Sequence, residues 1–203
     1  SNTVVEAMRD FKLEFHKLSS GPGSSKAEIE AYRSSLESYY RNDFNNEYQS
    51  QNGEQVDVSS LIPTDAETII SQYSYIADNS NPLGMKHLME RAEADTQYNK
   101  LHAIYHPIIA NYLDKFGYYD IFLVDPQTGH IVYSVFKELD YATSLSTGPY
   151  RDTNFARSFR LAADSSERDS VHLVDFEPYL PSYEAAASFI SSPITDPSDG
   201  SLL

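Results

Sequence analysis

Two histidines stand four residues apart in the segment HAIYH, at His102 and His106, so a helix would place them on one face. Such a pair can bind a metal ion, and Glu90, Glu93 or the upstream His87 could supply a further ligand. The segment lacks the glutamate of a zinc-protease helix, which leaves a metal-assisted hydrolase as the weakest of three hypotheses. Helix residues that hydrogen-bond to their neighbours are the simpler interpretation. We therefore expect no metal site, no cofactor, no catalytic residue and no enzymatic activity.

Carboxylates gather in the second half of the chain, at Asp120, Asp125, Asp140, Asp152, Asp175 and Glu177. Paired carboxylates can perform general acid–base chemistry, but with 30 acidic residues in the chain some pairs arise by chance. Asp125 is best explained as a turn residue. Asp175 differs, because the segment VHLVDF puts it on the same strand face as Val171 and Leu173. We expect it to point inward, where a carboxylate needs a partner such as Arg151, Lys137 or the amino group of a ligand.

The aromatic side chains are the most suggestive group, since the chain has 16 tyrosines and 10 phenylalanines. A tyrosine offers an apolar ring with a hydroxyl tip, which suits a small polar ligand that also carries hydrocarbon. Core packing, with hydroxyls that reach the surface, is the competing interpretation. The predicted ligand-binding set is Tyr133, Phe136, Lys137, Asp140, Tyr141, Tyr150, Arg151, Asp175, Tyr179 and Tyr183. Asp175 would hold a cationic group of the ligand, and Arg151 or Lys137 an anionic one.

The composition of the whole chain excludes several other functions. A formal net charge of −15 repels phosphate backbones and anionic lipid, so we expect no nucleic-acid partner and a weak preference for cationic or zwitterionic ligands. The chain has no cysteine, which excludes disulfides and thiolate chemistry. No apolar run approaches the ~20 residues that span a bilayer. Ser1 and Asn2 resemble the remnant of a cleaved tag, so we expect flanking segments that anchor the protein in a membrane.

Before residue 117, the apolar residues are spaced as in helices. Apolar residues at three- and four-residue spacing predict helices over 3–20 and, with a stripe from Ile29 to Tyr48, over a second segment that ends in a loop at 49–60. A capping box that starts at Thr64 predicts a third helix. A fourth helical pattern runs from about 84 to 116. Pro107 should kink or split this fourth helix, and Gly117 should cap its C-terminus.

After Gly117 the period changes to that of strands. The segments 119–124 and 130–136 predict a hairpin, followed by a polar loop over 137–150 and a helix over 153–163. The segments 171–176 and 185–190 predict two more strands. Strands joined by hairpins and one short helix favour an antiparallel sheet. We therefore predict an α+β fold with a helical subdomain over 1–116 and a sheet domain over 117–203.

The sheet half resembles a Cache domain, a PAS-like extracytoplasmic sensor module of bacterial chemoreceptors, sensor histidine kinases and membrane-bound nucleotide cyclases. The similarity is carried by the D-x-x-T-G turn from Asp125 to Gly129 and by the D-x-A-T-x-L-x-x-G-P-Y segment from Asp140 to Tyr150. It continues in E-P-Y-x-P-S-Y from Glu177 to Tyr183, before AASFISSPI. It covers residues 117–203, and the helical part is longer than the single helix that usually precedes a Cache sheet.

This resemblance implies a PAS-like antiparallel sheet in which the last strand is expected to be missing, because the chain ends where a fifth strand should start. It implies a ligand-sensing domain of a transmembrane signalling receptor on the periplasmic face of the bacterial inner membrane. The partners would be a small molecule of the amino acid, amine or carboxylate class and, in the full-length receptor, a second copy of the chain. A protein-interaction module of a periplasmic signalling protein, without a small-molecule ligand, is the alternative. An exposed apolar patch on the helices would favour that alternative.

Overall fold

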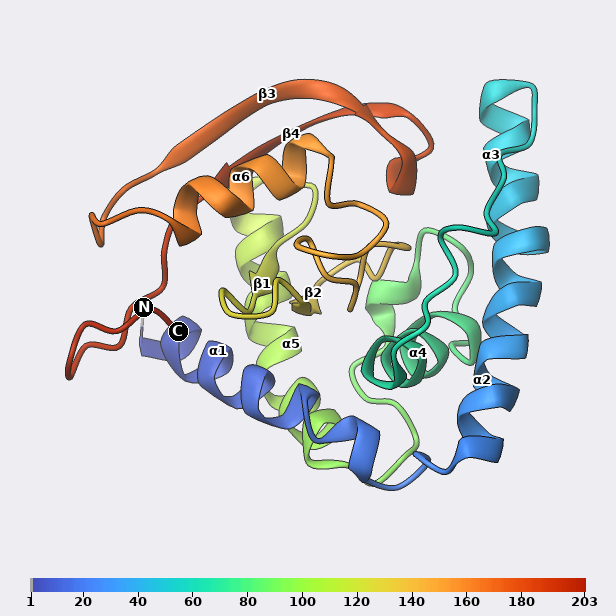
Figure 1. Cartoon of the computed structure of the whole chain (residues 1–203), viewed down its shortest axis with the longest axis horizontal. Helices are drawn as coiled ribbons and strands as arrows, with labels where there is room; N and C mark the ends of the chain where they lie inside the picture. The colour runs from blue at the N-terminus through green and yellow to red at the C-terminus, as the bar shows by residue number, and fades with distance from the viewer. Residues whose placement is uncertain (1) are drawn as a thin grey trace.

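A computed structural model describes residues 2–203, and its first half is helical (Figure 1). The α-helices of this half are α1 (Asn2–Phe15), α2 (Lys26–Tyr39), α3 (Asn45–Asn52), α4 (Ala66–Gln72) and α5 (Gln97–Phe116). A π-helical turn over Tyr40–Phe44 joins α2 to α3 without a break, and a second one over Tyr73–Ala77 extends α4. The four predicted helical segments are thus all present, with different ends.

The ends of these helices follow from local chemistry. Helix α1 buries Met8, Phe11 and Phe15 along one face, which confirms its predicted amphipathic pattern. The α2–α3 helix runs to Asn52 and ends at Gly53, whose φ of 85° allows a left-handed cap, so the loop predicted from residue 49 begins later. Gly117 caps α5 with a φ of 71°, and its amide donates to the Leu113 carbonyl at 2.9 Å, as predicted.

Two predictions about the helices are wrong, and a third is wrong in part. The N-cap of α4 is Asp65 rather than Thr64, because the Asp65 carboxylate accepts the Thr68 amide at 2.9 Å. Segment 84–96 is not part of the fourth helix: it holds one short 3₁₀ turn, and α5 begins only after the N-cap Thr96. Of the two effects expected of Pro107, a kink or a split, the split does not occur, because α5 continues on both sides of it.

The second half contains two hairpins separated by a helix. Strands β1 (Phe122–Val124) and β2 (Ile131–Ser134) pair antiparallel, as do β3 (His172–Tyr179) and β4 (Ala185–Ser191). Helix α6 (Asn154–Ala163) starts at the N-cap Thr153. In Figure 1 the β3–β4 hairpin arches over α6, and β1 and β2 lie between α6 and α1. The predicted α+β class is confirmed, and within residues 2–203 the strands form two separate two-stranded sheets.

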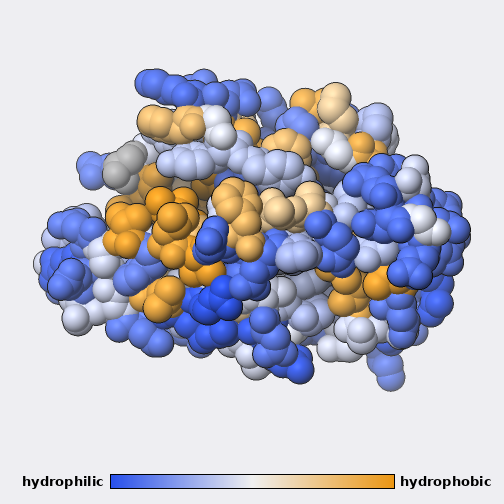
Figure 2. All heavy atoms as spheres, turned by 90° about the horizontal axis from the view of Figure 1, so that it is seen from above, coloured by the Kyte–Doolittle hydropathy of each residue, from blue (hydrophilic) through white to orange (hydrophobic). Residues whose placement is uncertain are grey.

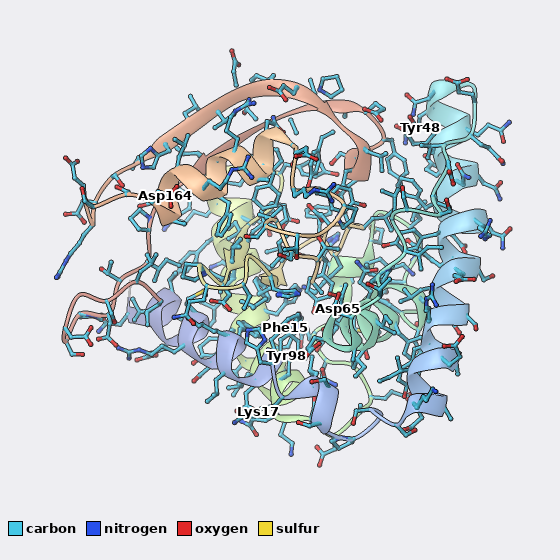
Figure 3. The ribbon with its side chains drawn as sticks, in the orientation of Figure 1. Phe15, Lys17, Tyr48, Asp65, Tyr98 and Asp164 are labelled. Atoms are coloured by element: carbon cyan, nitrogen blue, oxygen red, sulfur yellow. The ribbon has the colours of Figure 1, made fainter. Side chains whose placement is uncertain are left out.

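One hydrophobic core runs through both halves. The ring of Phe11 from α1 stacks on Tyr133 of β2 at 4.8 Å, and the Tyr98 hydroxyl of α5 donates to the Val132 carbonyl at 2.7 Å. Figure 3 places Phe15 and Tyr98 close together where α1 crosses α5. The domain boundary at residue 116 remains a prediction, although buried side chains join the two parts.

The segment 137–150, predicted as a polar loop, is largely buried between the two halves. Its backbone is held by the helices: the Gln72 amide donates to the carbonyls of Leu139 and Tyr141 at 2.9 and 2.8 Å. The Thr68 hydroxyl donates to the Ala142 carbonyl at 2.8 Å. These bonds satisfy carbonyls that burial would otherwise leave unpaired, so the segment belongs to the core.

Candidate functional site

A cleft of about 790 Å³ lies between β1, α6 and the β3–β4 hairpin. It is lined by residues 117–122, by side chains along one face of α6, by three residues of β3 and all of β4, and by Ile194, Leu202 and Leu203. Figure 2, seen from the side of the β3–β4 hairpin, shows hydrophobic side chains gathered in this part of the surface. We refer to this hollow as the cleft.

Aromatic rings form the walls of the cleft. Phe155 of α6 and Phe189 of β4 stack with their centroids 4.5 Å apart and their planes within 5°. Phe122 of β1 lies 4.5 Å from the Phe155 ring, and Tyr179 meets Phe189 edge-on at 5.1 Å. The three elements thus contact one another through rings, which gives the cleft an apolar wall of defined shape.

One end of the cleft is acidic, and we call the group Tyr119, Asp120, Glu138 and Ser182 the acidic end. The Glu138 carboxylate accepts the Tyr119 hydroxyl at 2.5 Å and the Ser182 hydroxyl at 2.8 Å. Burial, followed by the charge of Asp140, raises the pKa of the Glu138 carboxyl to about 8. This group therefore changes its charge close to neutral pH.

Asp120 is fixed by one of its two oxygens. Its Oδ1 accepts the backbone amides of Ile121, Val135 and Phe136 at 2.6, 2.9 and 3.2 Å. Its Oδ2 is buried and has no hydrogen-bond partner among the described residues. Burial and the charge of Asp140 raise the pKa of the Asp120 carboxyl to about 7, against the opposing charge of Lys137. The residue thus offers an oriented oxygen that can accept a further hydrogen bond.

Lys137 and Asp140 lie behind the acidic end in the protein interior. The Lys137 ammonium donates to the Ser134 carbonyl and faces the rings of Tyr133, Tyr141 and Tyr75 at 4.5, 4.9 and 5.6 Å. Burial lowers the pKa of Lys137 to about 7. Tyr133 and Tyr141, two of the predicted ligand-binding residues, enclose the lysine in the core and do not line the cleft.

Asp140 joins two further predicted residues in a second buried group. The Tyr179 hydroxyl donates to its carboxylate at 2.7 Å, and the Tyr150 ring lies 6.3 Å from that of Tyr179. Burial raises the pKa of Asp140 to about 6. Of the ten predicted ligand-binding residues, Tyr179 is the one that lines the cleft. Glu138 is the residue of the 137–150 segment that lines the cleft. The pocket was expected beneath this segment, and the cleft instead lies beside it.

Four predicted residues lie away from both groups. Asp175 is exposed, so the prediction that it points inward is wrong. The segment VHLVDF has apolar residues on both faces of β3, so the apolar pattern does not indicate which face is buried. Val174 is buried, while Leu173, on the same face as Asp175, is 71% exposed. Arg151 is exposed and bonds to Gly148 and Asp152.

The other two are Phe136 and Tyr183, which both pack in aromatic pairs. Phe136 stacks on Tyr119 at 5.2 Å, and Tyr183 stacks on Phe44 at 5.1 Å. Neither residue lines the cleft. Their rings therefore support the residues around the acidic end without facing a ligand.

Sequence reasoning missed Glu138, Tyr119, Ser182 and the phenylalanine walls, and it counted Asp120 only as one acidic residue among many. A usable signal is present in KELD at 137–140, where three ionisable residues stand in a segment with a strand on one side and apolar residues on the other. Ionisable groups in such a segment are buried with partners or face a cavity. Lys137 is buried with partners, and Glu138 faces the cleft.

The histidines have structural partners. His102 Nδ1 lies 2.7 Å from the Glu90 carbonyl, and His106 lies 2.6 Å from the His87 carbonyl and 2.8 Å from the Tyr133 hydroxyl. Burial and the charge of Lys137 lower the pKa of both rings, that of His106 to about 3, so they are neutral. Within residues 2–203 no three histidine or acidic side chains are placed to hold a metal ion.

No family model, no curated protein and no solved structure matches the chain. None of the helices described over residues 2–203 combines the length and the apolar character that crossing a bilayer requires.

Proposed function

We propose that the chain is a ligand-sensing domain of a transmembrane signalling receptor of the chemoreceptor type, which binds a small polar molecule in the cleft. The observation that carries this proposal is the cleft itself, about 790 Å³ in volume, with apolar walls and a polar end. Binding sites for small molecules typically have ~300–1,000 Å³ and this combination of linings. The resemblance to Cache domains adds the extracytoplasmic location, the homodimer and the flanking membrane anchors to the proposal.

The sheet of this sensor is proposed to be PAS-like, with a further strand between β1 and β4. Both strands have one edge without a strand partner, and both line the cleft. In residues 192–203, which we call the C-terminal arm, Thr195 bridges Leu202 in antiparallel pairing, and the Leu203 amide donates to the Ile194 carbonyl at 2.9 Å. A strand that continued this arm would run antiparallel beside β4, and it would join the two hairpins into one sheet of five strands.

Such a strand would enter the cleft at the end opposite to Asp120 and Glu138. Helix α1 marks this entry, because Arg9 pairs with Asp196 of the arm and Lys12 pairs with Asp125 of the β1–β2 turn at 3.2 Å. The acidic end lies beyond the other end of β1, beside Ser182. A strand and a small ligand can therefore occupy different parts of the same cleft.

The acidic end is also connected to the helices, which a sensor requires. Glu138 precedes Leu139 and Tyr141, the residues whose carbonyls bind Gln72 of α4. Tyr40, at the junction of α2 and α3, donates to the same Gln72 side chain at 2.8 Å. A ligand that displaces Glu138 would act on α2 and α4 through this buried segment. This requires that the ligand bind the protein more tightly with Glu138 displaced than with Glu138 in its present position.

A thermal-shift screen tests the proposal. Ligands of the folded state raise the melting temperature, and we expect one class among amino acids, amines, carboxylates and purines to do so. Ala186→Trp, a substitution at an exposed residue of the cleft wall, should abolish that shift. Arg151→Ala, outside the cleft, should leave it unchanged. The absence of any shift, in the chain as given and in one extended by a strand after Leu203, would contradict the proposal.

A protein-interaction module is the second candidate, favoured by a row of exposed apolar residues on α5. Ile104 and Ile108 are 58% and 37% exposed on the same face, and Phe116 is 64% exposed at the end of the helix. A second copy of the chain fits this face, since an apolar helix stripe is complementary to itself. Sedimentation equilibrium should then detect a dimer that Ile104→Glu dissociates. A monomer at all concentrations would remove this candidate.

A further inference from the structure

The cleft has a one-sided charge. Asp120 and Glu138 are the acidic side chains that line it, and no lysine, arginine or histidine of the described residues does so. Their raised pKa values leave them partly protonated near neutral pH, and a bound cation would favour their charged forms. The chain as a whole carries a formal net charge of −15, which adds to the negative potential in the cleft. A carboxylate ligand would meet repulsion here, whereas a cation would be attracted.

The Asp120 carboxylate is prepared for one more donor. Three backbone amides hold its Oδ1, while its buried Oδ2 has no partner among the described residues. A buried oxygen of this kind costs free energy until it accepts a hydrogen bond. Because the amides fix the carboxylate plane, the direction in which Oδ2 can accept is fixed as well.

The nearest buried cation does not take this position. Lys137 donates its ammonium to the Ser134 carbonyl, and three tyrosine rings surround it. It forms no ion pair with Asp120 or Glu138, although its charge acts on Asp120 through the protein interior. The carboxyl groups of the acidic end are therefore not paired with a cation of the protein.

We propose that the cleft binds a primary amine with an apolar body, whose ammonium group lies at Asp120 and Glu138. The hydrocarbon part would lie against the ring wall of Phe122, Phe155 and Phe189. The inference rests on the proposed function and names the ligand class of the same site. A simple amine fits better than an amino acid, because the cleft offers no cation for an α-carboxylate.

Calorimetric titration with phenethylamine, 3-phenylpropionate and phenethyl alcohol tests the class, since the three probes share one ring and differ in charge. We expect phenethylamine to bind and the other two to bind at least tenfold more weakly, because an ammonium–carboxylate pair contributes more than about 1.4 kcal/mol when partly desolvated. Glu138→Gln should weaken phenethylamine at least tenfold. Glu177→Gln, the same change at a surface carboxylate of β3, should leave its affinity within about twofold.

Asp120→Asn provides the second variant, and cooperative melting of each variant shows that it is folded. Tighter binding of 3-phenylpropionate, or undiminished phenethylamine binding in both carboxylate variants, overturns the amine class. In that case a ligand whose shift Ala186→Trp abolishes would still support the cleft as a sensor site. If no probe and no compound of the wider screen binds, the amine class and the proposed function both fail.

Discussion

Lys137 and Glu138 are neighbours in the chain, yet the protein places their charges in opposite environments. Lys137 has a φ of 61°, in the left-handed region, and this backbone turn directs its side chain into the core while Glu138 faces the cleft. Three tyrosine rings and a carbonyl surround the lysine, which is 3% exposed. The comparison teaches that one buried ionisable group completes the core, whereas the other remains available to a ligand.

Lys137→Ala tests this comparison most strongly, because it should cause the largest loss of stability. Removal of the four-carbon stem leaves a cavity among Tyr75, Tyr133 and Tyr141, and we expect a loss of about 2–4 kcal/mol in the free energy of unfolding. Urea denaturation followed by circular dichroism measures it. Lys100→Ala, at an exposed residue, should cost less than about 0.5 kcal/mol. Equal costs at both positions would contradict the core role of Lys137.

Gly129→Ala should have the next largest effect, because the 137–150 segment packs against this turn. An added Cβ would lie 2.4 Å from the Ser146 hydroxyl and 2.8 Å from its backbone nitrogen, and the φ of 74° is unfavourable for alanine. We expect a loss of about 2–3 kcal/mol in thermal or urea unfolding. The control is Gly84→Ala, with a φ of 76° and no atom within 4 Å, which should cost only about 1 kcal/mol.

A smaller effect is the pH dependence of stability, in which the acidic residues and Lys137 act in opposite directions. Burial raises the folded-state pKa of Glu138 to about 8 and that of Asp120 to about 7, above the usual carboxyl range. Their stabilising contribution is complete below about pH 4 and is lost as the pH rises through 7 and 8.

Lys137, with a folded-state pKa lowered to about 7, contributes in the opposite direction at pH 7 and above. The melting temperature should therefore fall by ~5 °C between pH 5 and 7. Glu138→Gln should reduce that slope, while Glu177→Gln should not. A melting temperature that stays constant over this interval in the wild type would show that Glu138 and Asp120 are solvated normally.

The smallest expected effect concerns the exposed residues that sequence reasoning placed in the site. Asp175→Asn and Arg151→Ala should each leave phenethylamine affinity within about twofold, because both side chains face solvent outside the cleft. Calorimetric titration of each variant measures this. A loss of tenfold or more in either variant would place the ligand elsewhere on the molecule.

Elements that depend on local signals could be predicted from the sequence, and those that depend on distant contacts could not. The stripe of α1, the Gly117 cap, the hairpin turn and α6 each follow from residues within one or two turns of the chain. Segment 84–96 has helical spacing but takes its shape from contacts with α5: the His87 carbonyl lies 2.6 Å from Nε2 of His106, 19 residues away in the chain. Such a long-range bond leaves no local pattern.

The same reason explains the candidate site. The sequence indicated tyrosines, acidic residues and Lys137 by residue type, but the direction in which each side chain points depends on how the backbone turns. The positive φ values of Lys137, Tyr183 and Glu184 reverse the alternation that a strand or loop would give. Asp175 was assigned to the wrong face because apolar residues occupy both faces of β3. The location of the cleft follows from the packing of α6 on a hairpin, which one sequence does not specify.

Helix α1 binds two turn tips that lie far apart in the sequence, since Arg9 pairs with Asp196 and Lys12 pairs with Asp125. The two residues of α1 that make these ion pairs are only three positions apart. Three residues correspond to ~4.5 Å along a helix axis. A piston-like sliding of α1 would therefore carry both tips the same way and keep their separation constant, whereas a tilt of α1 would spread them. Spin labels at Gln127 and Ser198 would distinguish the two motions, because only a tilt changes the distance between them. The two ion pairs thus couple both turns to any movement of α1, and their separation would respond to a tilt alone.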